Sequence, residues 1–110
     1  LDGQLEVNTV SSNDLFRIPL DAAGKACAPV QIRVPRRLKS PDGMRAANGK
    51  LFLAENSGGQ VDMLGISGDR ATVTVLKTGL MTPTAVEPHG ETLWIGDRAA
   101  SKAIAMPLPK

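Results

Sequence analysis

The chain has 110 residues, of which 42% are hydrophobic and 22% charged, and its formal net charge is +2. This composition excludes a disordered chain, and so small a charge gives no strong attraction to nucleic acid or to an anionic membrane. No apolar run approaches the ~20 residues that span a bilayer. A single cysteine, Cys27, and a single histidine, His89, exclude a disulfide framework and a zinc site built from cysteine and histidine clusters. We expect one small domain or a part of a larger one.

Alternation of apolar and polar residues predicts short β-strands along the whole chain. Glycine and proline together number 11 + 8 = 19 residues, and their spread leaves few stretches long enough for an amphipathic helix. Turn pairs such as Asn48-Gly49 and His89-Gly90 separate the alternating segments. The expected strands lie near residues 4–9, 14–20, 29–34, 43–47, 50–55, 60–67, 71–78, 84–88, 91–96 and 102–108. The predicted fold class is therefore all-β.

An internal repeat organises these strands. Leu51 and Leu93 stand at matching places 42 residues apart, and Leu5 lies 46 residues before Leu51. A period in the low forties with about four strands per copy is typical of a β-propeller blade. The copies run roughly over residues 1–37, 38–79 and 80–110, so the sequence predicts a single partial propeller domain of about two and a half four-stranded blades.

The expected strands are too few for three complete blades, which would need about twelve. The first copy lacks its innermost strand and the last copy lacks its outermost. Blades bury their faces against neighbouring blades, and two and a half blades cannot close a ring. We therefore expect the remaining blades to come from upstream sequence or from another chain.

Several motifs go beyond the repeat itself. The most specific is Pro41-Asp42-Gly43-Met44, which leads into a Gly-Lys-Leu strand, and further motifs lie at residues 15–21, 58–61, 83–85 and 93–95. Together they resemble the gluconolactonase/regucalcin (senescence marker protein) family of six-bladed β-propellers. The resemblance covers nearly the whole chain and corresponds to the C-terminal third or so of a family member.

The resemblance implies a metal-dependent hydrolase. Members of the family bind a divalent cation, commonly calcium, at one end of the central channel, and many hydrolyse lactones or related esters there. Asp42 matches the aspartate of the family's Pro-Asp-Gly-Met motif, which implies that Asp42 is a metal ligand and the catalytic base that takes a proton from water. Zinc, magnesium and manganese are the alternative cations. The family's glutamate near the chain start and its asparagine ligands in earlier blades have no counterpart here.

The implied partners are a small-molecule lactone or ester and the remaining blades, without nucleic acid or membrane. The alternative function is a non-catalytic propeller module for binding or interaction, since one scaffold hosts unrelated functions. The alternative for Asp42 is structural, because Ser40-Pro41-Asp42-Gly43 is also a good turn sequence. Both the cytoplasm and the periplasm or exterior are compatible with a single cysteine.

Other polar residues are expected to have local roles. Glu55 and its repeat counterpart Asp97 are expected to support a blade turn or to pair locally, and a role in a site is the alternative for Glu55. Asn8 and Asn13 are expected in turns or caps. Asn56, at the end of the same strand as Glu55, is a further candidate oxygen donor.

The remaining candidates are interpreted as scaffold. A basic stretch is expected to be a solvated connection, with an anion-orienting guanidinium from Arg37 or Arg45 as the alternative; its members are Arg33, Arg36, Arg37, Lys39 and Arg45. His89 is expected in a hairpin turn, and Cys27 is expected to be a free thiol in a loop. Phe52 and Trp94 occupy matching strand positions and are expected to fill the space between blades.

Overall fold

The computed structural model describes residues 1 and 3–109, and these form ten β-strands and no helix. The strands are β1 (Leu5–Thr9), β2 (Asp14–Ile18), β3 (Val30–Gln31), β4 (Pro41–Ala47), β5 (Lys50–Glu55), β6 (Gln60–Ser67), β7 (Arg70–Lys77), β8 (Pro83–His89), β9 (Thr92–Asp97) and β10 (Lys102–Pro107). The all-β prediction is confirmed. No helix in the described part of the chain is long and apolar enough to cross a membrane.

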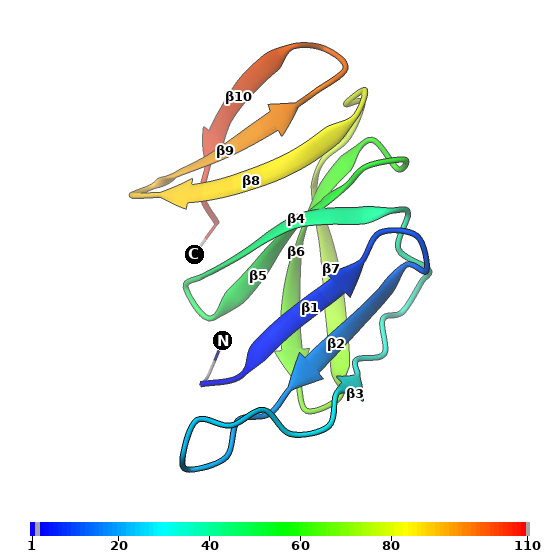
Figure 1. The fold of residues 1–110 in the computed structure, drawn as a ribbon. Helices are drawn as coiled ribbons and strands as arrows, with labels where there is room; N and C mark the ends of the chain where they lie inside the picture. The colour runs from blue at the N-terminus through cyan, green and yellow to red at the C-terminus, as the bar shows by residue number, and fades with distance from the viewer. Residues whose placement is uncertain (2, 110) are drawn as a thin grey trace.

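The strands pair into three antiparallel sheets that follow the chain order. The first sheet has the order β1-β2-β3, the central sheet β4-β5-β6-β7, and the third sheet β8-β9-β10. Figure 1 shows β8, β4 and β1 side by side, each at the edge of its own sheet, with the other strands of the sheets leading away from them. Each sheet therefore contributes one edge strand to a shared row. In the central and third sheets this edge strand is the first of the repeat, whereas β1 corresponds in the repeat to β5 and β9.

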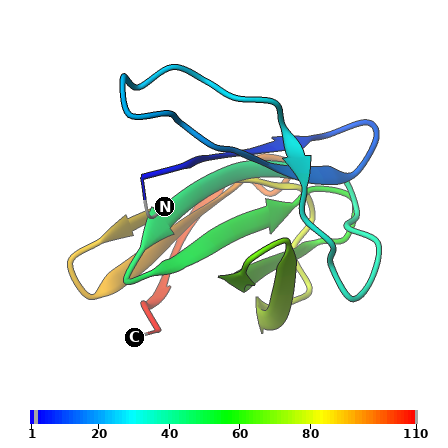
Figure 2. The same cartoon turned by 90° about the horizontal axis from the view of Figure 1, so that it is seen from below.

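The third expected strand is shorter than its apolar pattern suggests. Val30 and Gln31 pair with β2, and the amide of Ile32 still donates to the carbonyl oxygen of Leu15 at 2.8 Å. At Arg33 the chain leaves β2 and forms a parallel bridge with Arg70 at the start of β7. The residues after Gln31 therefore connect the first sheet to the central sheet through backbone hydrogen bonds. The connection between β2 and β3 projects away from the sheets in Figure 2, and residues 20–29 within it are exposed.

The pairing registers reproduce the repeat seen in the sequence. Leu51 lies opposite Leu64, and the residues 42 positions later, Leu93 and Met106, lie opposite each other as well. The residues 46 positions earlier, Leu5 and Ile18, form the same pair. The register shift between β4 and β5 just after Pro41 recurs between β8 and β9 just after Pro83. The repeat is thus a repeat of hydrogen-bond geometry as well as of residue type.

Strand β5 of the central sheet is buried on both faces. On β5, Leu51 and Leu53 point into a core shared with the first sheet, and Phe52 and Ala54 point into a core shared with the third. Period-two alternation sends successive side chains to opposite faces, so an uninterrupted apolar strand fits only between two neighbours. The first core contains Leu15, Ile32, Leu38, Leu51, Leu53, Leu64 and Ala71. The second contains Phe52, Ala54, Val61, Val86, Leu93 and Ile95.

Gly43 marks the closest approach of the central and third sheets. A Cβ atom on Gly43 would lie 2.6 Å from the carbonyl oxygen of Thr84 and 2.8 Å from the Cα of Ala85. Both contacts are with backbone, which cannot rotate out of the way as a side chain does. Glycine is therefore required here by the distance between β4 and β8.

We predict that Gly43→Ala lowers the free energy of unfolding by about 1–3 kcal/mol, because the added methyl group forces β4 and β8 apart. Gly96→Ala is the matched control, since Gly96 also lies in a strand and its Cβ would meet only the side chain of Ala85 at 3.6 Å. Urea unfolding of the two variants measures the difference. Equal stabilities would contradict the role assigned to Gly43.

Candidate functional site

Asp42 lies at the start of β4, within the shift in the pairing register between β4 and β5, and it is half-buried. Pro41 pairs with Glu55 and Met44 pairs with Leu53, so the two residues between them have no regular partner on β5. The interpretation of residues 40–43 as a turn is wrong: Pro41 to Gly43 belong to the strand, and the positive φ of 54° is at Ser40. The irregular backbone at the start of β4 presents Asp42.

Two asparagine side chains meet Asp42. Asn8 of β1 donates from Nδ2 to the backbone oxygen of Asp42 at 2.7 Å. Asn56, which follows β5, donates from Nδ2 to Oδ2 of Asp42 at 3.4 Å, and its backbone amide donates to the carbonyl oxygen of Ser40 at 2.9 Å. We call Asn8, Asp42 and Asn56 the Asp42 cluster. It combines one carboxylate and two carboxamides from the first and central sheets.

The turn or cap role expected of Asn8 is wrong, whereas Asn13 has the expected turn conformation. Asn8 lies inside β1, and its side chain crosses to the central sheet instead of closing a turn. Asn13 has a φ of 62° in the hairpin between β1 and β2, and its Oδ1 accepts a hydrogen bond from the amide of Ser40 at 2.8 Å. The repeat contains a signal for Asn8, because its counterparts 46 and 88 residues later are Ala54 and Gly96, which carry no polar side chain.

A buried charge network lies beside the Asp42 cluster. The Glu55 side chain is fully buried and accepts two hydrogen bonds from Arg36, at 2.9 and 2.6 Å. It also accepts from the backbone amide of Lys39 at 2.7 Å and from Nε2 of Gln60 at 2.9 Å. The fully buried Asp62 accepts from the same Gln60 nitrogen at 2.9 Å and from Arg36 at 3.4 Å. We call Arg36, Glu55, Gln60 and Asp62 the Glu55–Asp62 network.

The two acids of the network have opposite protonation preferences. Burial raises the pKa of Asp62 to about 7, and the neighbouring Glu55 carboxylate adds to the rise. Burial alone would also raise the pKa of Glu55, but the hydrogen bonds from Arg36, Asp62 and the Lys39 amide lower it to about 2. Arg36 therefore neutralises an ionised Glu55, while Asp62 remains neutral into the physiological range.

The expected local role of Glu55 and Asp97 is confirmed. Asp97, at the end of β9, accepts hydrogen bonds from the backbone amides of Thr82 at 2.8 Å and Met81 at 2.9 Å. These bonds, the one from Thr82 foremost, lower the pKa of Asp97. Glu55 makes the equivalent bond to Lys39, whose position is 42 residues before Met81. In both sheets an acid at the end of the second strand therefore fixes the segment that leads into the first strand.

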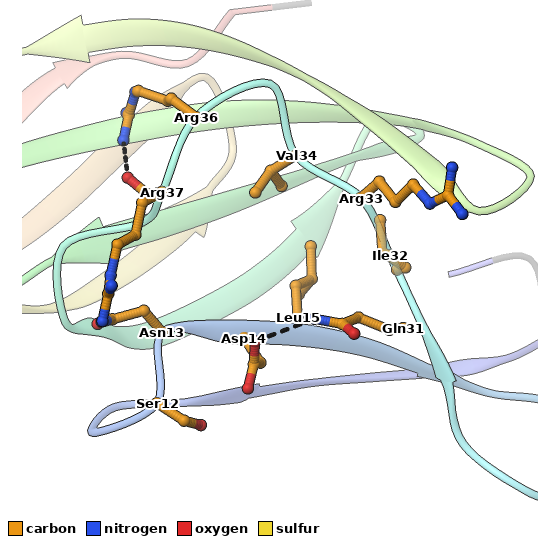
Figure 3. Close-up of a pocket in the computed structure, with 10 residues that line it drawn as sticks. All are labelled: Ser12, Asn13, Asp14, Leu15, Gln31, Ile32, Arg33, Val34, Arg36 and Arg37. Carbon is orange, nitrogen blue, oxygen red and sulfur yellow. Dashed lines mark hydrogen bonds between the residues drawn. The ribbon is translucent and has the colours of Figure 1, made fainter.

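Three members of the basic stretch, Arg33, Arg36 and Arg37, line a groove of about 500 Å³ between the first sheet and the connection to β4 (Figure 3). Arg36 is held by the buried acids and also donates to the carbonyl oxygen of Arg37 at 3.2 Å. Arg33 and Arg37 are exposed, and Arg45 lies outside the groove, 3.6 Å from the exposed carboxylate of Glu87. The ten residues along the groove are Ser12, Asn13, Asp14, Leu15, Gln31, Ile32, Arg33, Val34, Arg36 and Arg37. Sequence reasoning gave Arg36 no individual role, because its partners lie 19 and 26 residues away.

His89 and Cys27 stand apart from these groups. His89 ends β8 and is exposed, and Cys27 is an exposed free thiol in the connection between β2 and β3. Within residues 1 and 3–109, no three side chains of histidine, cysteine, aspartate or glutamate gather as a ready metal site. Any cation at the Asp42 cluster would therefore rely on carboxamide oxygens or on ligands from other sheets.

No protein-family model matches this chain, and no curated protein sequence matches it either.

We predict that Asp62→Asn removes a pH dependence of stability. Because the pKa of Asp62 in the folded state is above its ordinary value of 3.8, its stabilising contribution is complete below pH ~4 and is lost as the pH rises through about 7. The variant should match the parent near pH 4 and exceed its free energy of unfolding at pH 8 by on the order of 2 kcal/mol. Urea unfolding at several pH values measures this difference.

Glu91→Gln is the control, since Glu91 is exposed, and this variant should follow the curve of the parent. Parallel pH profiles of the parent and Asp62→Asn would contradict the assignment.

Proposed function

We propose that the three sheets are consecutive blades of a β-propeller and that the chain forms part of a metal-dependent, lactonase-like hydrolase. The observation that carries the proposal is the Asp42 cluster, in which Asn8 donates to the backbone oxygen of Asp42 and Asn56 donates to its carboxylate, where β1 and β4 lie side by side. Inner strands of successive blades border the same channel, so ligands from other blades reach the same place.

The donor set suits a hard divalent cation. Calcium takes 6–8 oxygen ligands, including carboxylates and carboxamides, whereas structural zinc sites favour cysteine and histidine. The carboxylate of Asp42 and the Oδ1 atoms of Asn8 and Asn56 would hold the cation from one side, in place of the hydrogen bonds that the two amide nitrogens donate to Asp42. The other ligands come from blades beyond these three. Calcium is accordingly the first choice, with magnesium or manganese next.

The residues of this chain would orient the reacting groups. Asp42, with Asn8 and Asn56, would hold a cation that could supply Lewis-acid chemistry, polarising a lactone or ester carbonyl and stabilising negative charge on its oxygen. Asn56 fixes one oxygen of the Asp42 carboxylate by its hydrogen bond. The carboxylate of Asp42 accepts the proton of the attacking water, and the fixed backbone between Pro41 and Met44 keeps that carboxylate in place.

A second candidate function is a non-catalytic propeller module that binds a partner or a small ligand. It is favoured by the single carboxylate of the Asp42 cluster, since the described residues contain no group of three metal-ligating acids, histidines or cysteines. The two candidates differ in whether calcium binds and whether a lactone is consumed.

We predict that the assembled protein, with the blades that supply the other ligands, binds calcium and hydrolyses simple lactones in a chelator-sensitive manner, and that Asp42→Asn weakens both. Loss of a ligand charge should reduce calcium affinity by at least about tenfold. Calorimetric titration with calcium and a pH-indicator assay with γ- and δ-lactones measure the two effects.

Glu91→Gln, which removes one exposed carboxylate elsewhere, should change neither. Hydrolysis that survives both chelation and Asp42→Asn would overturn the enzymatic proposal. A folded chain without calcium binding would favour the binding module.

A further inference from the structure

The two outer sheets each leave one apolar face uncovered by the described residues. On the first sheet, Leu5 and Val7 are 52% and 41% exposed, and they share a face with their cross-strand partners Ile18 and Phe16. On the third sheet, Trp94 is 44% exposed. We call the first surface the front face; it consists of Leu5, Val7, Phe16 and Ile18. We call the second the back face; it consists of Trp94, Gly96, Ala103 and Ala105.

The repeat shows what each face is built to contact. The front-face residues correspond, 88 positions later, to residues of the third sheet that pack against the central sheet; these are Leu93, Ile95, Ile104 and Met106. The back-face residues correspond, 42 positions earlier, to residues of the central sheet against which the opposite face of the third sheet packs; these are Phe52, Ala54, Val61 and Met63. A front-type face and a back-type face therefore already form one interface inside the chain.

The side chains of the two uncovered faces differ in size from their counterparts inside the chain. Where the central sheet has Phe52 and Met63, the back face has the larger Trp94 and the smaller Ala105. Where the third sheet has Ile104, the front face has the larger Phe16. In a contact between the two faces, the larger Phe16 would have room where Ala105 replaces a methionine, as close packing between apolar surfaces requires.

We propose that a second copy of this chain docks head to tail, with the back face of one copy on the front face of the other. The inference rests on the blade arrangement proposed above and is independent of the cation chemistry. Such a contact joins two different surfaces, and two copies can satisfy both contacts by closing a ring. Six sheets would then surround one channel, and each copy would bring its own Asp42 cluster to the same channel mouth.

Trp94 reports on this contact directly because it is the only tryptophan in the chain. Sedimentation across a wide concentration range, without calcium or substrate, should show a reversible dimer. Tryptophan emission should shift to shorter wavelength over the same range as the indole leaves water. A chain that stays monomeric at high concentration would overturn the proposal, whatever the outcome of the calcium and lactone assays.

Two charge substitutions separate head-to-tail docking from other modes of association. Val7→Asp blocks the front face and Trp94→Asp blocks the back face, and each alone should weaken self-association by at least about tenfold. Mixing the two variants should restore a one-to-one complex, because one intact face of each kind remains. Since only Val7→Asp then carries a tryptophan, the blue shift on mixing arises from that single interface.

Two further variants serve as a control for the front face and as a second test of the back face. Val10→Asp is the control for Val7→Asp, since Val10 is 47% exposed in the adjacent hairpin and should associate like the parent. Ala105→Asp is a second back-face variant that retains Trp94, and circular dichroism confirms that each variant is folded. Self-association of folded Val7→Asp, or failure of the mixed variants to form a complex, would contradict head-to-tail docking.

Discussion

The burial of both faces of β5 is the constraint on which the rest of the structure depends. Leu51 and Leu53 on one face and Phe52 and Ala54 on the other are almost completely removed from water. A sheet with two apolar faces is stable only between two further layers. The first and third sheets supply those layers, and their own far faces remain apolar because they are built from the same repeat. Each outer face of the three sheets is therefore an apolar surface of the same kind as the faces that pack between the sheets.

Polar groups fix the ends of the sheets where apolar packing stops. Glu55 and Asp97 occupy equivalent places and bind the backbone of the segment that enters their own sheet. This contact closes the first strand of each sheet onto the end of the second. In the central sheet it also fixes the start of β4, which is where Asp42 lies. The hydrogen bond that Glu55 accepts from the Lys39 amide thus also helps to position Asp42, the candidate functional carboxylate.

The strands and the repeat follow from the sequence because both depend on short-range patterns. Alternation and turn residues located all ten strands, and the 42-residue shift reappears in the register of Leu93 with Met106. The predictions from sequence were wrong where contacts between residues far apart in the chain determine the structure. The third strand ends early because Arg33 bridges to Arg70, and Asn8 reaches β4 instead of capping a turn.

The basic stretch shows the same limit for electrostatics. Five cations lie close together in the sequence, yet Arg36 alone among them reaches the buried acids Glu55 and Asp62. Which cation is buried depends on the path of the connection between β3 and β4, and no local pattern encodes that path. The prediction of a solvated basic segment therefore describes Arg33, Arg37, Lys39 and Arg45, which are exposed.

Departures from the repeat separate scaffold from candidate function. Asp62 stands where the other sheets have Phe16 and Ile104, and burying an acid at an apolar position costs stability unless hydrogen bonds and charge offset it. Arg36 and Gln60 supply part of that offset. Asp42, whose counterpart in the third sheet is Thr84, belongs to the same sheet as Asp62. Positions that repeat maintain the stack, whereas two acids that break the repeat, Asp42 and Asp62, both belong to the central sheet. The central sheet is therefore where scaffold and candidate function can be told apart.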